Sequence, residues 1–391
     1  MTPARDALPD PMALDVSELV ATLAGQVQRD YAPPRVKRDA HPKMHGCVQA
    51  ELIVWPKIAS DLRHGVFTTP GVSYRAWIRF SNAFRIQHDL KFDTRGMGIK
   101  LLGVLGDKPW SDETHTQDFL LATHDAFFLP DEKEYVEFAQ AVGEDPPKVL
   151  GFFSKPHRWR WAIQMFRSFV VLARNPLAIP YFSQTPYRLG PNLVVKLHAR
   201  PCLTQELGDS LPARWSFWCQ AIVGNLILFA RQSRAKSAVA EAWCERCIAD
   251  RNFLRLAMMS FLAGHEASFD LLVQRRIDSP KMPIDDATRR WPEWLSSFEK
   301  VATIRVPRQV FWPQTGFSLE LGKKTSEMTE LGENMSFNPW HTLRDHEPLG
   351  AINLARRQVY PAIVELRHRL NGVDRTEPTT HHYDRLKNIV Q

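Results

Sequence analysis

The chain has 391 residues, enough for one elaborated domain or for two, and its 44% hydrophobic and 24% charged residues are typical of a soluble globular protein. The net charge of +7 is modest, and the Arg and Lys residues behind it are scattered rather than gathered in one basic tract. This pattern favours an anionic ligand or an anionic membrane surface as a partner and argues against nucleic acid.

The cysteines and the apolar stretches predict a cytoplasmic protein, with membrane association left open. Residues 1–39 contain no apolar core of a secretory signal, and the five cysteines are sparse and odd in number. The longest apolar run, residues 215–230, is shorter than the roughly 20 residues of a membrane span and predicts a buried or interfacial helix. Cys244 and Cys247 have the spacing of a redox pair, but their Ala-rich helical context favours a packing role.

The N-terminal half of the chain predicts an arm followed by an antiparallel barrel. Residues 1–35 are Pro-rich around one short amphipathic helix at 16–30, and we expect them to form an extended arm. Short strand patterns separated by turn signals then follow. The expected strands are 47–55, 76–81, 93–102 and 116–122.

Two of these segments carry polar side chains at informative spacings. Arg38 and His41 stand three positions apart, so a cation and a base can address one ligand. In the second strand Arg79 and Ser81 share one face, while Phe80 faces the other way.

Residues 351–372 predict a helix that presents a phenol between two cations. At about 100° per residue, Arg356, Tyr360 and Arg367 lie on one face. The charge of Arg356 is expected to lower the pKa of the Tyr360 phenol, and an ionised phenol can hold ferric iron. Pro361 stands inside this helix, where proline needs support from the surrounding structure.

Five motifs in order along the chain resemble those of the catalase-like haem proteins. Each motif is weak alone, but the five span residues 38 to 367 in the family's order. They are Arg38-x-x-His41-x-Lys43, Ile78-Arg-Phe-Ser81, Asp93-x-Arg-Gly96-x-Gly-x-Lys100, the stretch from Thr116 to Phe128, and Arg356-x-x-x-Tyr360-Pro with Arg367, preceded by Phe337-x-Pro339.

The resemblance implies a haem b cofactor and a role for each matching residue. Tyr360 would be the iron ligand, and Arg356 would keep it ionised. His41 would be the distal acid and base, with His45 as its rival if the register shifts. Three arginines would bind the haem propionates, and Ser81, Phe127 and Phe128 would lie beside the porphyrin. Those arginines are Arg38, Arg79 and Arg367, with Arg369 as the rival of Arg367.

The distal amide is where the chain departs from catalases. They place an Asn shortly before the paired Phe residues, whereas here the matching region is Ala122-Thr-His-Asp-Ala126, with Thr123 as the nearest candidate. Ala40 also replaces the Val that is common before the catalytic His. Fast dismutation of hydrogen peroxide is therefore in doubt, and a bulkier hydroperoxide becomes a reasonable substrate.

The middle of the chain resembles the shorter catalase-related group, which includes small peroxidases and allene oxide synthases. The implied fold is α+β: an antiparallel β-barrel that encloses haem, with surrounding helices and a C-terminal helix that carries the Tyr ligand. The expected divisions are an arm at 1–35, a barrel domain at 36–310 with a helical insertion at about 205–250, and a wrapping segment with the ligand helix at 311–391.

Three functions follow from these expectations. The first is a haem peroxidase or catalase acting on hydrogen peroxide or an organic hydroperoxide. The second is an isomerase or lyase of fatty-acid hydroperoxides, and the third is a haem-binding module at a membrane surface without turnover. Segments rich in Trp and Arg, at 152–173 and 215–231, suit a membrane surface or the entrance for a lipid substrate. The oligomeric state is left open, a homo-oligomer included.

Overall fold

The computed structural model describes residues 16–110, 112–143, 148–171, 173–202 and 250–387. The predicted insertion at about 205–250 lies almost entirely outside these residues, as do Cys244, Cys247, the apolar run at 215–230 and the first 15 residues of the predicted arm. None of the described helices is long and apolar enough to cross a membrane.

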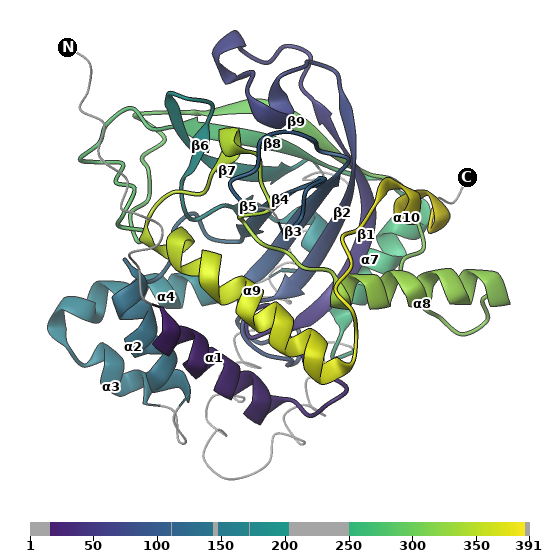
Figure 1. Ribbon diagram of the computed structural model, residues 1–391, viewed down its shortest axis with the longest axis horizontal. Helices are drawn as coiled ribbons and strands as arrows, with labels where there is room; N and C mark the ends of the chain where they lie inside the picture. The colour runs from purple at the N-terminus through teal and green to yellow at the C-terminus, as the bar shows by residue number, and fades with distance from the viewer. Residues whose placement is uncertain (1–15, 111, 144–147, 172, 203–249, 388–391) are drawn as a thin grey trace, which may run out of the picture.

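A closed antiparallel β-barrel forms the centre of the molecule (Figure 1). The strands of the described chain follow the order β5-β4-β3-β2-β1-β9-β8-β7-β6, and β5 also pairs with β7, which closes the sheet and leaves β6 at its rim. The strands are β1 (Lys43–Val54), β2 (Ser73–Asn82), β3 (Arg95–Leu102), β4 (Thr116–Ala122), β5 (Tyr181–Phe182), β6 (Tyr187–Leu189), β7 (Leu193–Pro201), β8 (Ala267–Arg275) and β9 (Phe298–Val306). The predicted α+β barrel fold is confirmed, and each of the four predicted strands is present.

Aromatic side chains fill the interior of the barrel. The rings of Phe80, Tyr181 and Phe269 come from β2, β5 and β8, and their centroids lie 6.0 to 6.4 Å apart. Strands that are not neighbours in the sheet can share such contacts only across the barrel. Phe80 therefore points inward, and the alternation of a strand turns Arg79 and Ser81 to the outer face.

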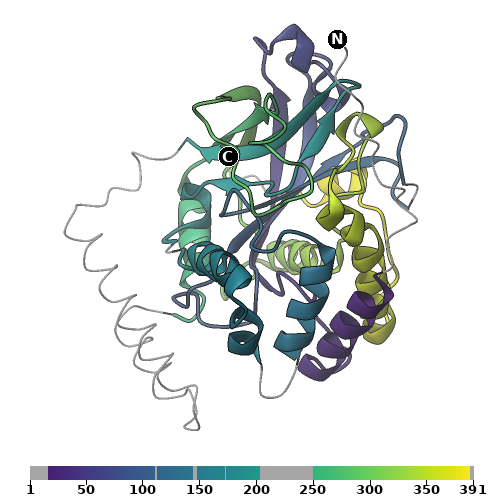
Figure 2. The same ribbon diagram turned by 90° about the vertical axis from the view of Figure 1, so that its left-hand side faces the viewer.

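Helices cover this outer face and the lower end of the barrel (Figures 1 and 2). The helices of the described residues are α1 (Ser17–Asp30), α2 (Glu132–Gly143), α3 (Val149–Phe153), α4 (Trp159–Phe169), α7 (Phe253–Gly264), α8 (Leu319–Asn334), α9 (Ala351–Asn371) and α10 (Thr380–Arg385). Packing against β1 and β2 is tight. A Cβ on Gly332 of α8 would lie 2.4 Å from Cβ of Cys47, and the ring of Tyr383 in α10 lies 5.6 Å from that of Trp77.

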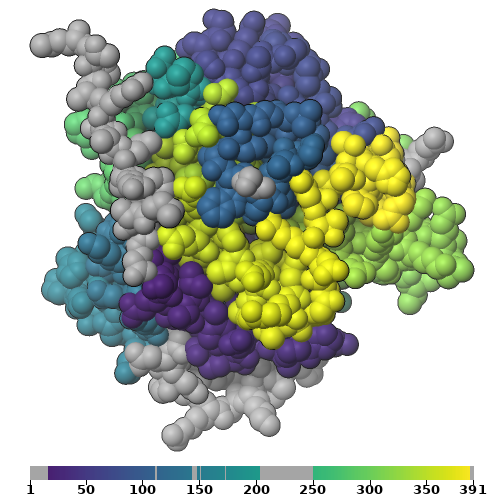
Figure 3. Space-filling view, viewed as in Figure 1, coloured from purple at the N-terminus to yellow at the C-terminus, as the bar shows by residue number. Residues whose placement is uncertain are grey.

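Helix α9 coincides almost residue for residue with the helix expected at 351–372. It begins after Gly350 and ends at Gly372, both of which have positive φ values (86° and 64°), where glycine carries no Cβ penalty. Pro361 lies inside it, as predicted. One side of α9, with Val359 and Ile363, packs on α1, and both helices are visible on the face shown in Figure 3.

Candidate functional site

A cavity lies between the outer wall of the barrel and α9. We call it the inner cavity; it encloses about 850 Å³ of space not filled by protein atoms, open solvent included. Its wall is formed by the segment before β1, by strands β2, β3 and β4, by the turn after β5, by Phe337 and by α9. The lining residues are Arg38, Asp39, Ala40, His41, Arg79, Ser81, Gly96, Met97, Gly98, Leu120, Leu121, Ala122, Ser183, Gln184, Phe337, Arg356, Tyr360, Ile363, Val364 and Arg367.

Strand register explains the barrel side of this cavity. Arg79 pairs with Gly98, and Ser81 pairs with Gly96, so both polar residues stand beside a glycine on the same face of the sheet. The glycines are needed for space. A Cβ on Gly96 would lie 2.3 Å from the His41 imidazole, and a Cβ on Gly98 would lie 3.0 Å from the ring of Phe337.

Helix α9 supplies the opposite wall. Arg356, Tyr360, Val364 and Arg367 are spaced by three or four residues, so they fall on one face, and all four line the inner cavity. The structure thus brings Tyr360 to the same cavity as His41. It leaves Arg369 exposed on the other side of the helix, while Arg367 is buried.

The predicted effect of Arg356 on Tyr360 was wrong in its net direction for the protein without a cofactor. Burial raises the pKa of the Tyr360 phenol above its usual value, and the charge of Arg356 only partly offsets this effect. The sequence shows the neighbouring charge one helical turn away, but the loss of solvent depends on the tertiary structure. The phenol is therefore neutral until a cation approaches it.

His41, and not His45, reaches the cavity. His41 Nδ1 is hydrogen-bonded to Ser81 Oγ at 3.0 Å. Burial, with the charges of Arg79, Arg356 and Arg38, lowers the pKa of His41 to about 3, so the imidazole is neutral. His45 is fully buried elsewhere and is hydrogen-bonded through Nε2 to Asn82 Oδ1 at 2.7 Å.

Three arginines gather at one end of the inner cavity, of which Arg79 and Arg367 are buried and Arg38 is partly buried. Arg38, Arg79 and Arg367 all donate hydrogen bonds to backbone carbonyls of residues 332–335 at the end of α8 and just after it. Burial and the charges of Arg79 and Arg367 lower the pKa of Arg38 well below its usual value. Glu333 is the carboxylate that pairs with them, 3.8 Å from Arg38 Nη1 and 4.0 Å from Arg79 Nη2, and the charge of Asp39 also acts on Arg367.

This arginine cluster is suited to bind further anionic groups. Two carboxylates, those of Glu333 and Asp39, act on the three guanidinium groups, and Arg79 Nη2 and Arg367 Nε have no hydrogen-bond partner among the described residues. Buried donors without partners are rare in folded proteins, because each costs free energy. A ligand with two carboxylates, such as haem, would satisfy these donors and balance the charge.

Three predicted site residues lie outside the inner cavity. Thr123 lines neither cavity of this region, because it continues the pairing of β4 with β3. Its hydroxyl accepts a hydrogen bond from the Arg95 backbone N–H at 3.1 Å. Phe127 and Phe128 instead line a neighbouring cavity, which we call the outer cavity.

The outer cavity encloses about 1020 Å³ of space not filled by protein atoms, open solvent included, and is walled mainly by aromatic and aliphatic side chains. It meets the inner cavity at five residues that line both: Asp39, Ala40, His41, Ala122 and Gln184. Sequence reasoning missed Asp39 and Gln184. Asp39 lies within the motif Arg38-x-x-His41, so the sequence could have indicated that it belongs to the site. Nothing in the sequence indicates that Gln184 lines the same cavities as His41.

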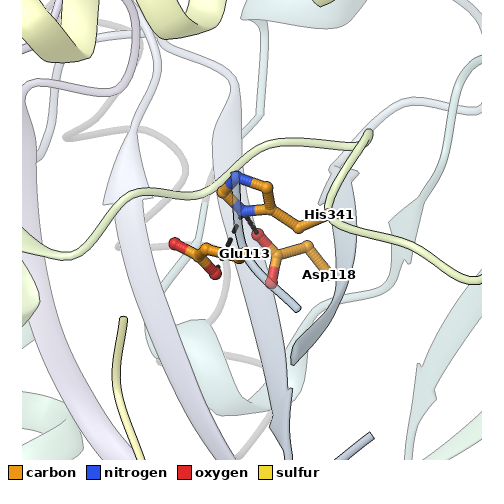
Figure 4. Close-up of side chains that lie close together, drawn as sticks. All are labelled: Glu113, Asp118 and His341. Atoms are coloured by element: carbon orange, nitrogen blue, oxygen red, sulfur yellow. Dashed lines mark hydrogen bonds and ion pairs between the residues drawn. The ribbon is translucent and has the colours of Figure 1, made fainter. Parts of the chain in front are cut away.

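A second cluster of buried polar side chains contains Glu113, Asp118 and His341, a set able to ligate a metal ion (Figure 4). However, the ammonium of Lys100 lies among them. Its Nζ is 2.8 Å from Asp118 Oδ1 and 3.2 Å from His341 Nδ1, and it also bonds to Glu113. The Lys100 cation therefore takes the position that a metal would need. Asp118 also accepts the Asn338 backbone N–H, which fixes the residue after Phe337.

Comparison with solved structures identifies the fold. The chain is similar to a fungal catalase (16% identity, TM-score 0.59, 89% of this chain and 62% of that chain) and to catalase A from Saccharomyces cerevisiae (16%, 0.59, 92% and 68%). A bacterial catalase is also similar (14%, 0.57, 97% and 67%). No protein-family model matches the chain, and neither does any curated protein.

The chain therefore has the fold of catalases, over 62% of the length of the fungal enzyme. At these identities the likeness concerns the fold, and the roles of individual residues remain to be argued from the cavity. The resemblance to the short catalase-related group stays a prediction.

Proposed function

We propose that the protein is a haem-dependent enzyme of the catalase or peroxidase type that processes hydrogen peroxide or an organic hydroperoxide. The observation that carries the proposal is the inner cavity itself. A half-buried phenol, a neutral imidazole and three guanidinium groups, two of them buried, line one cavity on the fold of catalases.

The residues present fit haem b. The phenol oxygen of Tyr360 would ligate the iron, and the three arginines Arg38, Arg79 and Arg367 would bind the propionates. Gly96 and Gly98 leave room in the barrel wall for the His41 imidazole and the Phe337 ring, which both line the cavity that haem would occupy. When bound, haem supplies the iron centre at which the O–O bond of a peroxide can be cleaved.

His41 would move the proton that this cleavage requires. The imidazole is neutral and its Nδ1 is engaged by Ser81, so Nε2 remains to accept the proton from one peroxide oxygen and return it to the oxygen that leaves. Arg79 Nη1 donates to the His41 carbonyl at 3.0 Å and holds the backbone of this residue against the barrel.

The test of the ligand assignment is Tyr360→Phe, with Tyr135→Phe as its control. Tyr135 is another buried phenol, and it lines the outer cavity. Both variants are purified after expression with haem supplied. We expect Tyr360→Phe to lose haem or to shift its absorption spectrum, while Tyr135→Phe retains the wild-type spectrum. A wild-type protein that binds no haem would refute the proposed function, and an unchanged Tyr360→Phe spectrum would refute the ligand.

The outer cavity supports organic hydroperoxides over hydrogen peroxide as the substrate, with fatty-acid hydroperoxide isomerisation as the second candidate function. The walls of the outer cavity include Phe84, Phe127, Phe128, Phe138 and Phe169, an apolar lining that hydrogen peroxide does not need. Apolar walls of this kind take up an acyl chain. Parallel assays of oxygen release from hydrogen peroxide and of consumption of linoleic acid hydroperoxide, with and without a reductant, separate dismutase, peroxidase and isomerase.

Helix α4 supports a peripheral contact with an anionic membrane. Trp159, Ile163 and Phe166 lie on one face of this helix and are 62%, 55% and 65% exposed, with Arg160 and Arg167 beside them. The end of the same helix reaches the outer cavity, since Ser168 and Phe169 line it.

Flotation with vesicles tests this contact. We expect the wild type to bind vesicles of phosphatidylcholine with phosphatidylglycerol, and Ile163→Ser with Phe166→Ser to abolish binding. Trp294→Ser, at a 76% exposed Trp outside α4, is the control and should bind as the wild type does. Equal binding by the α4 variant and the wild type would refute the contact.

A further inference from the structure

Two residues of the described chain other than glycine have positive φ values: His41, at 59°, and Gln184, at 61°. Such backbone conformations are uncommon for residues with a Cβ and cost free energy, and they concentrate where a side chain has to be held in a particular place. Both residues line the inner and the outer cavity. These two strained backbone conformations therefore both lie at the junction of the two cavities.

The backbone around Gln184 is a tight turn. The Thr185 N–H donates to the Ser183 carbonyl at 2.7 Å, across Gln184, which together with the positive φ describes a classic γ-turn, a rare and strained form. The turn is anchored on both sides. Ser183 Oγ accepts the Leu197 N–H at 3.0 Å, and Thr185 Oγ1 donates to Asn353 Oδ1 of α9 at 3.2 Å.

Nothing in this turn requires glutamine. Glycine would adopt the same φ without a penalty, and the side chain of Gln184 has one weak hydrogen bond within the described residues, from Nε2 to the Ala126 carbonyl at 3.3 Å. A half-buried amide kept at a strained position is best explained by what it does in the cavity.

The position of the hydrogen bond from Gln184 to the Ala126 carbonyl is informative. Residues 122–126 match the segment in which the resemblance places the distal amide of catalases, and here that segment offers Thr123, whose hydroxyl accepts the Arg95 N–H. The amide of Gln184 reaches the same segment from the turn after β5. Gln184 and His41 both line the junction at which the outer cavity meets the inner one.

We propose that Gln184 is the substrate-positioning amide of this site, paired with His41 over the inner cavity. This inference rests on the proposed function. A hydroperoxide carries one O–H donor and two oxygen acceptors, and an amide offers both a donor and an acceptor. Gln184 holds the hydroperoxide so that its proton faces His41, and the amide itself exchanges no proton. Because it comes from a turn bonded to α9 through Asn353, its placement depends on the helix that carries Tyr360.

The test uses Gln184→Gly, which removes the amide and suits the backbone, and Gln184→Glu, which keeps the shape but replaces the amide with a carboxyl group. Gln140→Ala is the matched control, because Gln140 is an amide of α2 that bonds to Glu18 and lines neither cavity. All variants are compared with the wild type for haem content, unfolding temperature, cyanide affinity of the ferric protein, and kcat and KM with a hydroperoxide.

We expect both Gln184 variants to retain haem and to lose at least about tenfold in cyanide affinity and in kcat/KM, the effect of about one hydrogen bond. Gln184→Gly should also unfold at the same temperature as the wild type or higher, because the strain is released. Gln140→Ala should match the wild type in affinity and turnover.

Two outcomes would overturn the inference while leaving the proposed function intact. One is cyanide affinity and kcat/KM within twofold of the wild type in both Gln184 variants that contain haem. The other is a Gln184→Gly protein that is clearly less stable than the wild type, which would show that the side chain supports the fold. Failure of the wild type to bind haem would overturn the proposed function and the inference together.

Discussion

The imidazole of His41 and the hydroxyl of Ser81 form a hydrogen bond in which Nδ1 lies 3.0 Å from Oγ. The two residues come from different elements, His41 from the segment before β1 and Ser81 from β2. Gly96 of β3 lies close against the imidazole, because a Cβ on Gly96 would lie 2.3 Å from the ring. The orientation of His41 is therefore set by the barrel wall.

Removal of the hydrogen bond between His41 and Ser81 should impair turnover more than it impairs cofactor binding. We expect Ser81→Ala to retain haem and to lose roughly 10-fold to 100-fold in kcat with a hydroperoxide, because a freely rotating imidazole is misplaced for proton transfer. Thr123→Ala is the control, since the Thr123 hydroxyl bonds to the Arg95 backbone away from both cavities. If Thr123→Ala lost as much turnover with full haem content, the original prediction for Thr123 would stand and this assignment would fail.

Arg367 and Arg369 provide a matched pair two positions apart on α9. Arg367 is 2% exposed and lines the inner cavity, whereas Arg369 is exposed to solvent. We expect Arg367→Leu to weaken haem binding at least about tenfold, because a charge-assisted hydrogen bond to a propionate is worth about 1.5 to 3 kcal/mol. Arg369→Leu should bind haem as the wild type does. Titration of the apoproteins with haem measures both, and equal affinities would remove Arg367 from the site.

Most of the barrel wall and of α9 could be predicted because local patterns determine them. The alternation of β2 correctly separated Arg79 and Ser81 from Phe80, and the helical spacing of residues 356, 360 and 367 placed them on one face. Each of these features depends on residues close in sequence.

The features that could not be predicted depend on contacts between distant segments. Gln184 lines the same cavities as His41 only because the turn after β5 folds against α9. No sequence pattern around Gln184 indicates a γ-turn. The net direction of the Tyr360 pKa shift likewise depends on burial by the tertiary structure. The ammonium of Lys100 meets His341 across 241 positions of sequence, which no local motif reports.

The buried charges around Lys100 should contribute strongly to stability. Removal of the ammonium would leave Asp118 and Glu113 buried without their closest cation, with Arg375 remaining 3.6 Å from Glu113, at a cost of about 3 to 5 kcal/mol. We therefore expect Lys100→Met to lower the free energy of unfolding by that amount in urea denaturation.

Lys324→Met is the comparison for this prediction. Its ammonium bonds to Glu320 at 2.9 Å on the surface of α8, where an i,i+4 ion pair is worth about 0.3 to 0.5 kcal/mol. A similarly small loss of unfolding free energy in both variants would show that Lys100 is not the cation of the buried cluster. It would reopen the question of a metal ion at Glu113, Asp118 and His341.

Acid sensitivity should arise from histidines that are buried in the neutral form. Burial, with nearby His64 and Lys108, lowers the pKa of His346 to about 3, and its Nε2 accepts the Val66 backbone N–H at 3.0 Å. In the unfolded chain the pKa is about 6.5, so between pH 6.5 and pH 3 the unfolded state binds a proton that the folded state does not. The contribution to stability is therefore fully present above pH 6.5 and is lost as the pH falls, by about 1.4 kcal/mol per pH unit.

His346→Gln tests this prediction, because the glutamine carbonyl can accept the Val66 N–H but does not titrate. From urea unfolding at pH 7.5 and pH 5, we expect the variant to lose about 2 kcal/mol less than the wild type between the two values. His381→Gln, at an exposed position in α10, should retain the wild-type pH dependence. His41 and His45, whose pKa values are also lowered to about 3 by burial, remain in both variants, so some acid sensitivity should persist. Identical pH dependence in His346→Gln and the wild type would show that His346 is not held neutral in the folded protein.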